Sequence, residues 1–124
     1  MSLKVLIVSH NLDIHQLVTD IIKIVFKKVA IERAHDINSL EEKLLGDSDE
    51  YGLVLLDSDF NDKHVEEAYT ILKEKSVALL KRLVVIADKS TVPGEENVLS
   101  QHPMLVRPFS LDKFEQITKE VSAS

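Results

Sequence analysis

The sequence predicts an α/β domain in which a parallel β-sheet carries helices on both faces. Two observations predict this class. Short, almost wholly apolar runs alternate along the chain with longer segments whose apolar residues recur three or four positions apart. Runs of the first kind are typical of strands buried on both faces, and the longer segments are typical of amphipathic helices. Their repeated alternation implies parallel pairing through right-handed crossovers.

The individual elements follow from these two patterns in chain order. The predicted strands are 4–8, 29–34, 53–56, 83–87 and 104–106. The predicted helices are 12–29, 39–45, part of 62–76, and a last helix that begins after Ser110. Pro93 and Gly94 interrupt the stretch 88–103, so we expect one short helix or an irregular loop there.

Local signals mark the helix ends and their buried faces. Asp13 lies in the first turn of the first helix, where a negative charge suits the helix dipole. Asn38 with Glu41 three residues later has the pattern of a capping box, and Gly46 is placed to end that helix. Ser110 is the expected N-cap of the last helix. The expected buried stripes are Val65, Ala68, Tyr69 and Leu72 in the third helix and Leu111, Phe114, Ile117 and Val121 in the last.

Length and charge limit the functions that the chain can have. Its 124 residues fit one domain, which we expect over residues 4–121. The net charge of −6 argues against a surface built to hold nucleic-acid phosphates. With no cysteine and no apolar segment fit to span a bilayer, we expect a cytoplasmic protein that makes no membrane contact. The first three residues could include residues left by cloning, and no prediction rests on them.

The residues that end the predicted strands are candidates for a functional site. Open α/β sheets place their sites just outside the carboxyl ends of the strands. Asp57 ends the most apolar run of the chain. Ser9 and His10 follow the first strand, Ala87 ends the fourth, and Arg107 follows the fifth. We therefore expect one strand-end acid, without an acidic partner on the first strand, and one arginine at this edge.

The order of these elements, an aspartate after the third strand and Arg107-Pro108-Phe109 after the fifth, resembles the receiver domain of two-component response regulators. The resemblance extends from Lys4 to about Val121. It implies the flavodoxin-like fold of CheY-like proteins, with strand order 2-1-3-4-5. It also implies a role in phosphorelay signal transduction.

The resemblance assigns Asp57 the position that accepts a phosphoryl group from a histidine kinase. In receivers a pair of acids after the first strand helps to bind Mg²⁺, whereas this sequence has Ser9 and His10. Because Mg²⁺ is usually held by one or two carboxylates, the loss of two negative charges disfavours a Mg²⁺ cofactor. Phosphoryl transfer depends on neutralising charge at the phosphoryl oxygens, so we expect phosphorylation to be weakened or lost.

The positions that respond to phosphorylation in receivers also differ. Ala87 stands where receivers have a Ser or Thr that bonds the phosphoryl group, and Met104 stands at the aromatic switch position. Arg107 replaces the lysine that precedes a cis-proline, here Pro108. Arg107 also permits a second hypothesis, an ion pair with Asp57 that acts as a structural lock. The expected pocket comprises Ser9, His10, Asp59, Ala87, Arg107 and Pro108.

The sequence also permits other interpretations of Asp57. Asp57 could simply cap the turn that follows it, or it could still accept phosphate from a kinase that supplies the missing charge. A metal-dependent enzyme using His10, Asp57 and Asp59 is disfavoured because no HxH or HxxxH spacing supports a metal site. A hydrolase triad of Ser9, His10 and Asp57 is rejected because adjacent strand residues point apart. The other histidines, His15, His35, His64 and His102, are expected to be solvated.

We therefore interpret the chain as a pseudo-receiver that signals through protein contacts and is not an enzyme. The expected partner is a histidine kinase or an output domain or protein, and neither nucleic acid nor a membrane is expected. The expected output surface lies around the fifth strand, 88–103 and the last helix. The sequence leaves open whether the domain dimerises and whether it is part of a longer chain.

Overall fold

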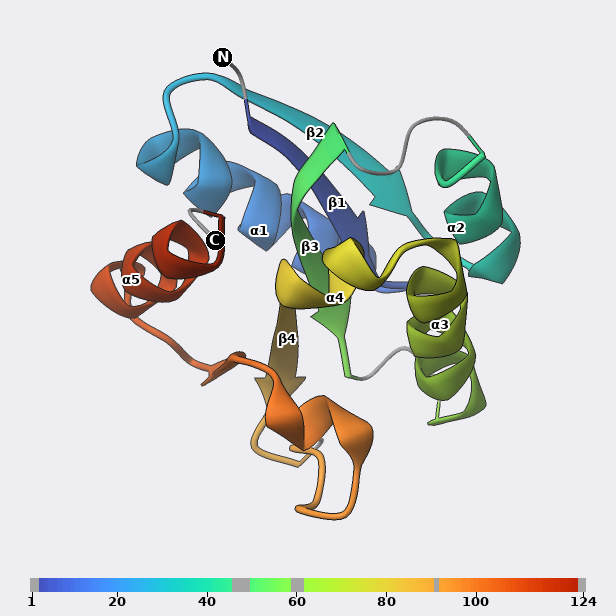
Figure 1. The fold of residues 1–124 in the computed structure, drawn as a ribbon. Helices are drawn as coiled ribbons and strands as arrows, with labels where there is room; N and C mark the ends of the chain where they lie inside the picture. Colours follow the sequence, from blue (N-terminus) through green and yellow to red (C-terminus); the bar gives the residue numbers. More distant parts are fainter. Residues whose placement is uncertain (1–2, 46–49, 59–61, 91, 123–124) are drawn as a thin grey trace.

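A computed structural model describes residues 3–45, 50–58, 62–90 and 92–122 (Figure 1). Five strands form one parallel sheet in the order β2-β1-β3-β4-β5, which confirms the predicted fold class and strand order. The strands are β1 Leu3–Val8, β2 Val29–Ala34, β3 Tyr51–Asp57, β4 Leu83–Asp88 and β5 Met104–Arg107. The helices are α1 Leu12–Val25, α2 Ile37–Lys43, α3 Asp62–Lys75, α4 Val77–Lys81, the 3₁₀ turn η2 Val98–Gln101, and α5 Leu111–Ser122.

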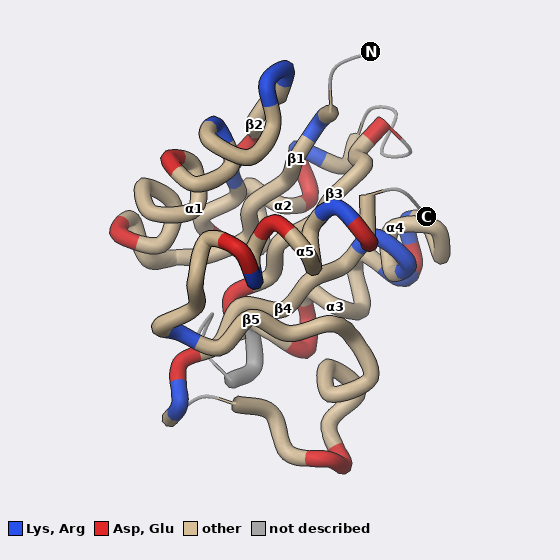
Figure 2. The backbone as a smooth tube through the Cα atoms, turned by 90° about the vertical axis from the view of Figure 1, so that its left-hand side faces the viewer, with Lys and Arg blue, Asp and Glu red and all other residues tan. Residues whose placement is uncertain are grey.

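Helices cover both faces of this sheet. α1 and α5 lie on one face, and α2 and α3 lie on the other (Figure 1). Side chains of β1 alternate between the two layers: Val5 and Ile7 pack with α1 and α5, whereas Leu6 and Val8 pack with α2 and α3. All four are fully buried, as expected of a strand inside a parallel sheet. Most Lys, Arg, Asp and Glu residues lie on the surrounding helices and loops (Figure 2).

Two helix ends differ from the sequence prediction. α1 ends at Val25, earlier than predicted, because the next residue already has extended backbone and leads into β2. α2 is capped by Asp36, whose side-chain oxygen accepts the Ser39 amide at 2.7 Å, so the prediction of Asn38 as cap is wrong. The predicted helix end at Gly46 lies outside the described residues. Within those residues, no helix is long and apolar enough to cross a membrane.

The described residues of the segment 88–103 include one short 3₁₀ turn, η2, in agreement with the prediction of a short helix or loop. Leu99 fixes this turn to the core, where it is 2% exposed. Tyr69 of α3 places its hydroxyl oxygen 2.9 Å from Nε2 of His102, just after the turn. The sequence did not predict α4, which buries Leu79 immediately before β4. The described part of the chain between β4 and β5 therefore contacts α3 through His102 and contains a 3₁₀ turn in place of an α-helix.

Candidate functional site at the carboxyl ends of the strands

The ends of β1 and β3 bring a serine and an aspartate together. Val8 pairs with Leu56, so Ser9 and Asp57 are the next residues on two adjacent strands. Ser9 is fully buried and Asp57 is 1% exposed. The Ser9 hydroxyl donates to Asp57 Oδ2 at 2.7 Å, and the Asn11 amide donates to Ser9 Oγ at 3.0 Å. Asp57 thus accepts a hydrogen bond from the hydroxyl of Ser9. Ser9 stands at a position where receivers carry an acid.

This hydrogen bond gives the buried carboxylate one of the partners that it needs. An ionised carboxylate removed from water is costly unless it is paired or hydrogen-bonded. At 2.7 Å, the Ser9–Asp57 bond has the length of a charge-assisted bond from a hydroxyl to a carboxylate. The bond also occupies Oδ2, so an incoming phosphoryl donor would have to displace the hydroxyl or use the other oxygen.

A histidine of α1 holds the same end of β1. His15 is 2% exposed, and its Nε2 donates to the backbone carbonyl of Ser9. Its ring lies 4.6 Å from the ring of His35, centroid to centroid. Burial lowers the pKa of His15 below its ordinary value of 6.5, which keeps the ring neutral near pH 7. Its Nδ1 is buried and has no hydrogen-bond partner within the described residues.

This histidine is not among the site residues that the sequence predicts. The expectation that His15 is solvated is wrong, and His102 is also partly buried beside Tyr69. The signal was present in the helical spacing, because the buried face of α1 is formed by Ile14, His15, Val18, Thr19 and Ile22. A polar residue on that face has to be hydrogen-bonded inside the protein. The Ser9 carbonyl supplies the acceptor.

The described residues at this edge do not fit a Mg²⁺ ion. His10 is exposed, Ser9 is engaged with Asp57, and Ala87 is fully buried without a hydroxyl to offer. No group of three or more His, Asp or Glu side chains that could hold a metal occurs in the described parts of the chain. Asp59, which the sequence placed in the same pocket, lies outside those parts. Among Ser9, His10, Asp57 and Ala87, only Asp57 carries a carboxylate, the kind of hard oxygen ligand that Mg²⁺ prefers.

Arg107 forms no ion pair with Asp57 in the described structure. Asp57 opposes Ile86 while Arg107 opposes Asp88, so the two residues lie on strands separated by β4, roughly 10 Å across the sheet. The ion pairs between described residues are Lys4–Glu50, Lys43–Glu32 and Lys119–Glu115. The Nε of Arg107 is buried and lacks a hydrogen-bond partner among the described residues. The lock hypothesis is therefore wrong, although the peptide bond to Pro108 is cis, as in receivers.

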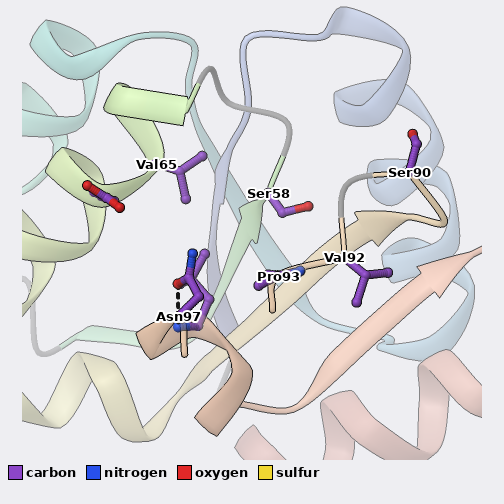
Figure 3. Close-up of a pocket in the computed structure, with 8 residues that line it drawn as sticks. Ser58, Val65, Ser90, Val92, Pro93 and Asn97 are labelled. Atoms are coloured by element: carbon purple, nitrogen blue, oxygen red, sulfur yellow. Dashed lines mark hydrogen bonds between the residues drawn. The ribbon is translucent and has the colours of Figure 1, made fainter. Parts of the chain in front are cut away.

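Two hollows open at this edge of the sheet, and Asp57 lines neither of them. One, of about 340 Å³, lies between α3 and the loop after β4. Figure 3 shows Ser58 at the end of β3, Val65 on α3 and Asn97 at the start of η2 around it. Asn97 fixes this turn by accepting the Leu99 amide at 2.9 Å.

The other hollow, of about 400 Å³, lies between α1 and the loop after β5. Its lining is Leu17, Ile21, Asp88, Arg107, Pro108 and Phe109. Met104, the predicted switch position, takes part in neither hollow and packs partly buried against the core under α3. Arg107 and Pro108 therefore line the groove, away from the Ser9–Asp57 pair.

Comparisons with known proteins agree with this fold. No family model and no curated protein sequence matches the chain. Among solved structures, a response regulator receiver domain protein from Clostridium thermocellum superposes with a TM-score of 0.79 at 9% identity, over 98% of this chain and 94% of that one. A response regulator from Thermotoga maritima gives a TM-score of 0.76 at 13% identity, over 100% of both chains. NtrX from Brucella abortus gives 0.76 at 19% identity, over 99% of this chain and 26% of that one.

The chain has the receiver fold. These matches confirm the resemblance in fold that the sequence predicted, over nearly the whole chain. At identities of 9% to 19% they show the fold alone. What the carboxyl edge of this receiver fold can do has to be argued from its own residues, because a fold does not fix a function.

Proposed function

We propose that this chain is a divergent receiver that signals through protein–protein contacts, with Mg²⁺-dependent phosphorylation of Asp57 weakened or lost. The observation that carries the proposal is the buried hydrogen bond between Ser9 and Asp57. The acceptor aspartate is kept at the strand end, while its neighbour on β1 is a neutral hydrogen-bond donor. That neighbour holds the carboxylate in place but adds no negative charge to attract a metal ion.

The surrounding charges support the same proposal. A phosphoryl group on Asp57 would add negative charge to a buried edge, and catalysis of the transfer depends on neutralising that charge. Ala87 offers no hydroxyl, and Arg107 lines a groove two strands away. A modification shifts a conformational equilibrium only through contacts that differ between the two states. Since Ala87 and Arg107 offer a phosphoryl group on Asp57 few such contacts, phosphorylation would shift the equilibrium little.

The partners that we propose are signalling proteins, either a histidine kinase or an output domain or protein. The receiver fold itself supports this class, because receiver domains generally contact kinases and output domains. We propose no enzymatic activity for the chain. The net charge of −6 argues against nucleic acid as a direct partner.

A receiver that still works is the second candidate. It is favoured by the position of Asp57 at the end of β3 and by the full set of receiver elements. In that case the kinase partner would supply part of the missing positive charge. Small-molecule phosphoryl donors separate the two candidates, because they react without a kinase.

The test incubates the protein with acetyl phosphate or phosphoramidate in the presence of Mg²⁺ and measures intact mass. We expect little or no phosphoryl adduct on the native chain. A stoichiometric adduct that disappears in Asp57→Ala would overturn the proposal in favour of the working receiver.

A variant that restores the acids gives the matched comparison. Ser9→Asp combined with His10→Asp returns two carboxylates to the end of β1, and we expect at least about tenfold more adduct than on the native chain. Circular dichroism checks that the variant is folded. If the folded variant gains no adduct, the missing acids are not the cause of weak phosphorylation, and the physical argument above fails.

A further inference from the structure

α1 carries apolar side chains outside its buried face. Leu17 is 42% exposed and Ile24 is 68% exposed, and Ile21, between them, is partly buried. These three residues follow one another at spacings of four and three, so they form one stripe along the helix. The core-facing residues Ile14, Val18 and Ile22 lie on a different side of the helix. An exposed apolar stripe of this kind on a folded domain marks a surface that is covered in use.

The stripe leads into the groove beside β5. Leu17 and Ile21 line the groove from α1, and Pro108 and Phe109 line it from the loop after β5. The volume of about 400 Å³ is ample for a branched aliphatic side chain. Phe109 is supported from behind by Phe114, with ring centroids 5.7 Å apart. α1 therefore offers a hollow near Leu17 and a protruding side chain, Ile24, roughly 10 Å further along its axis.

The charges at the two ends of the stripe are opposite in sign. Asp13 lies in the first turn of α1, four residues before Leu17, whereas Lys28 lies beyond the end of α1 at Val25, where the chain leads into β2. Both side chains are exposed. Acidic segments lie on α1 and basic segments lie where the chain passes towards β2 (Figure 2). A second copy of the same stripe, turned antiparallel, would bring Asp13 of each copy towards Lys28 of the other.

We propose that this chain forms a two-fold dimer in which α1 packs antiparallel against α1 of a second copy. The axis passes near Ile21, Ile24 of each copy enters the Leu17–Phe109 groove of the other, and Asp13 faces Lys28. The same patch serves both copies, as an isologous interface requires. A second copy is the occupant that the observations favour, because the stripe is complementary to itself in both shape and charge.

Sedimentation equilibrium over a wide range of protein concentration tests the apolar contact. We expect the native chain to associate reversibly to a dimer, and Ile24→Lys to raise the dimer dissociation constant at least about tenfold. A lysine suits the last turn of α1, so the variant should stay folded. The matched control is Val77→Lys, because Val77 is 65% exposed on α4 and takes no part in the stripe. This control should associate like the native chain.

Charge reversal tests the orientation of the two helices. Asp13→Lys and Lys28→Asp should each weaken the dimer, because each places like charges opposite one another at both ends of the interface. Mixing the two variants should restore association, since both pairs in the mixed dimer are again opposite in sign. Association in the mixture that is stronger than in either variant alone supports the antiparallel arrangement.

Three results would overturn the proposal. The native chain could remain a monomer at every concentration, which would assign the stripe to a different partner. Ile24→Lys and Val77→Lys could weaken association equally, which would place the interface elsewhere. The mixed variants could associate no better than each alone. None of these measurements involves phosphorylation, so they succeed or fail independently of the proposed function.

Discussion

The carboxyl edge of the sheet is closed at one end and open at the other. At the ends of β1 and β3, Ser9 and Asp57 bond to each other and are at most 1% exposed. At the end of β5, Arg107 lines an open groove, and its Nε has no hydrogen-bond partner within the described residues. Both ends occupy the region where open α/β sheets place their sites.

The difference teaches that position in a fold and readiness to react are separate properties. Asp57 has the position that the resemblance assigns to a phosphoacceptor, and a serine hydroxyl donates to its buried carboxylate. The groove beside Arg107 is an accessible part of the same edge, and the described residues include no group of three or more His, Asp or Glu side chains that could hold a metal. The closed end thus favours stability, and the open end favours contact with another molecule.

The largest expected effect is at the closed end, in the variant Ser9→Ala. It removes the hydroxyl that donates to the buried Asp57 carboxylate, so we expect the free energy of unfolding to fall by about 1.5–3 kcal/mol. Urea unfolding at neutral pH measures this change.

A double-mutant cycle isolates the bond from the other roles of Ser9. In an Asp57→Asn background the acceptor is neutral, so Ser9→Ala should cost less than in the native chain. The contact of Ser9 with the Asn11 amide is common to both backgrounds and cancels. If Ser9→Ala costs the same in both, the hydroxyl does not stabilise a charged Asp57, and the contrast between the two ends disappears.

The parts of the fold that could be predicted are those determined by local runs. Buried strands and the position of Asp57 follow from uninterrupted apolar stretches, and the structure has them within a few residues of the prediction. The helix cap could not be predicted in this way. Asp36 and Asn38 are both good N-caps two residues apart, and in the structure Asp36 is the cap.

Buried polar groups were the other limit of sequence reasoning. The predicted buried stripe of α5 includes Leu111, but this residue is 45% exposed. Thr118, which the predicted stripe does not include, is fully buried. Thr118 can be buried because its hydroxyl donates to the Phe114 carbonyl at 2.7 Å. The Ser9–Asp57 bond joins residues 48 positions apart, so it depends on strand register, which no local pattern contains. One hydrogen bond within α5 and one between the ends of β1 and β3 therefore account for buried polar residues that the apolar pattern does not reveal.

An intermediate effect is expected from His15, which holds the closed end through the Ser9 carbonyl. Burial lowers the pKa of His15 in the folded protein, so the unfolded chain binds more protons between that pKa and the ordinary value of 6.5. This contribution to the free energy of unfolding is fully present above about pH 6.5 and is lost as the pH falls further. His102, whose pKa burial also lowers, acts in the same direction.

The variant His15→Leu separates these contributions. It cannot titrate, so the free energy of unfolding should depend less steeply on pH between about pH 5 and pH 7 than in the native chain. At neutral pH the variant should be less stable by about 1 kcal/mol, because the Ser9 carbonyl loses its donor. His102→Gln combined with His15→Leu should flatten the profile further. Parallel profiles for native chain and variant, measured by urea unfolding, would contradict the assignment of a buried neutral His15.

The smallest expected effect is at the open end, in the variant Arg107→Met. Because Arg107 forms no ion pair within the described residues, we expect the free energy of unfolding to change by less than about 0.5 kcal/mol. Arg82→Met is the matched control, since Arg82 donates to the Tyr51 carbonyl at 3.0 Å and should cost about 1 kcal/mol or more when removed. Equal losses in the two variants would mean that Arg107 has a structural partner after all. If Arg107→Met changes the free energy of unfolding little, the Arg107 side chain is available to bind a molecule that enters the groove. This availability distinguishes the end of β5 from the ends of β1 and β3, where Ser9 and Asp57 bond to each other.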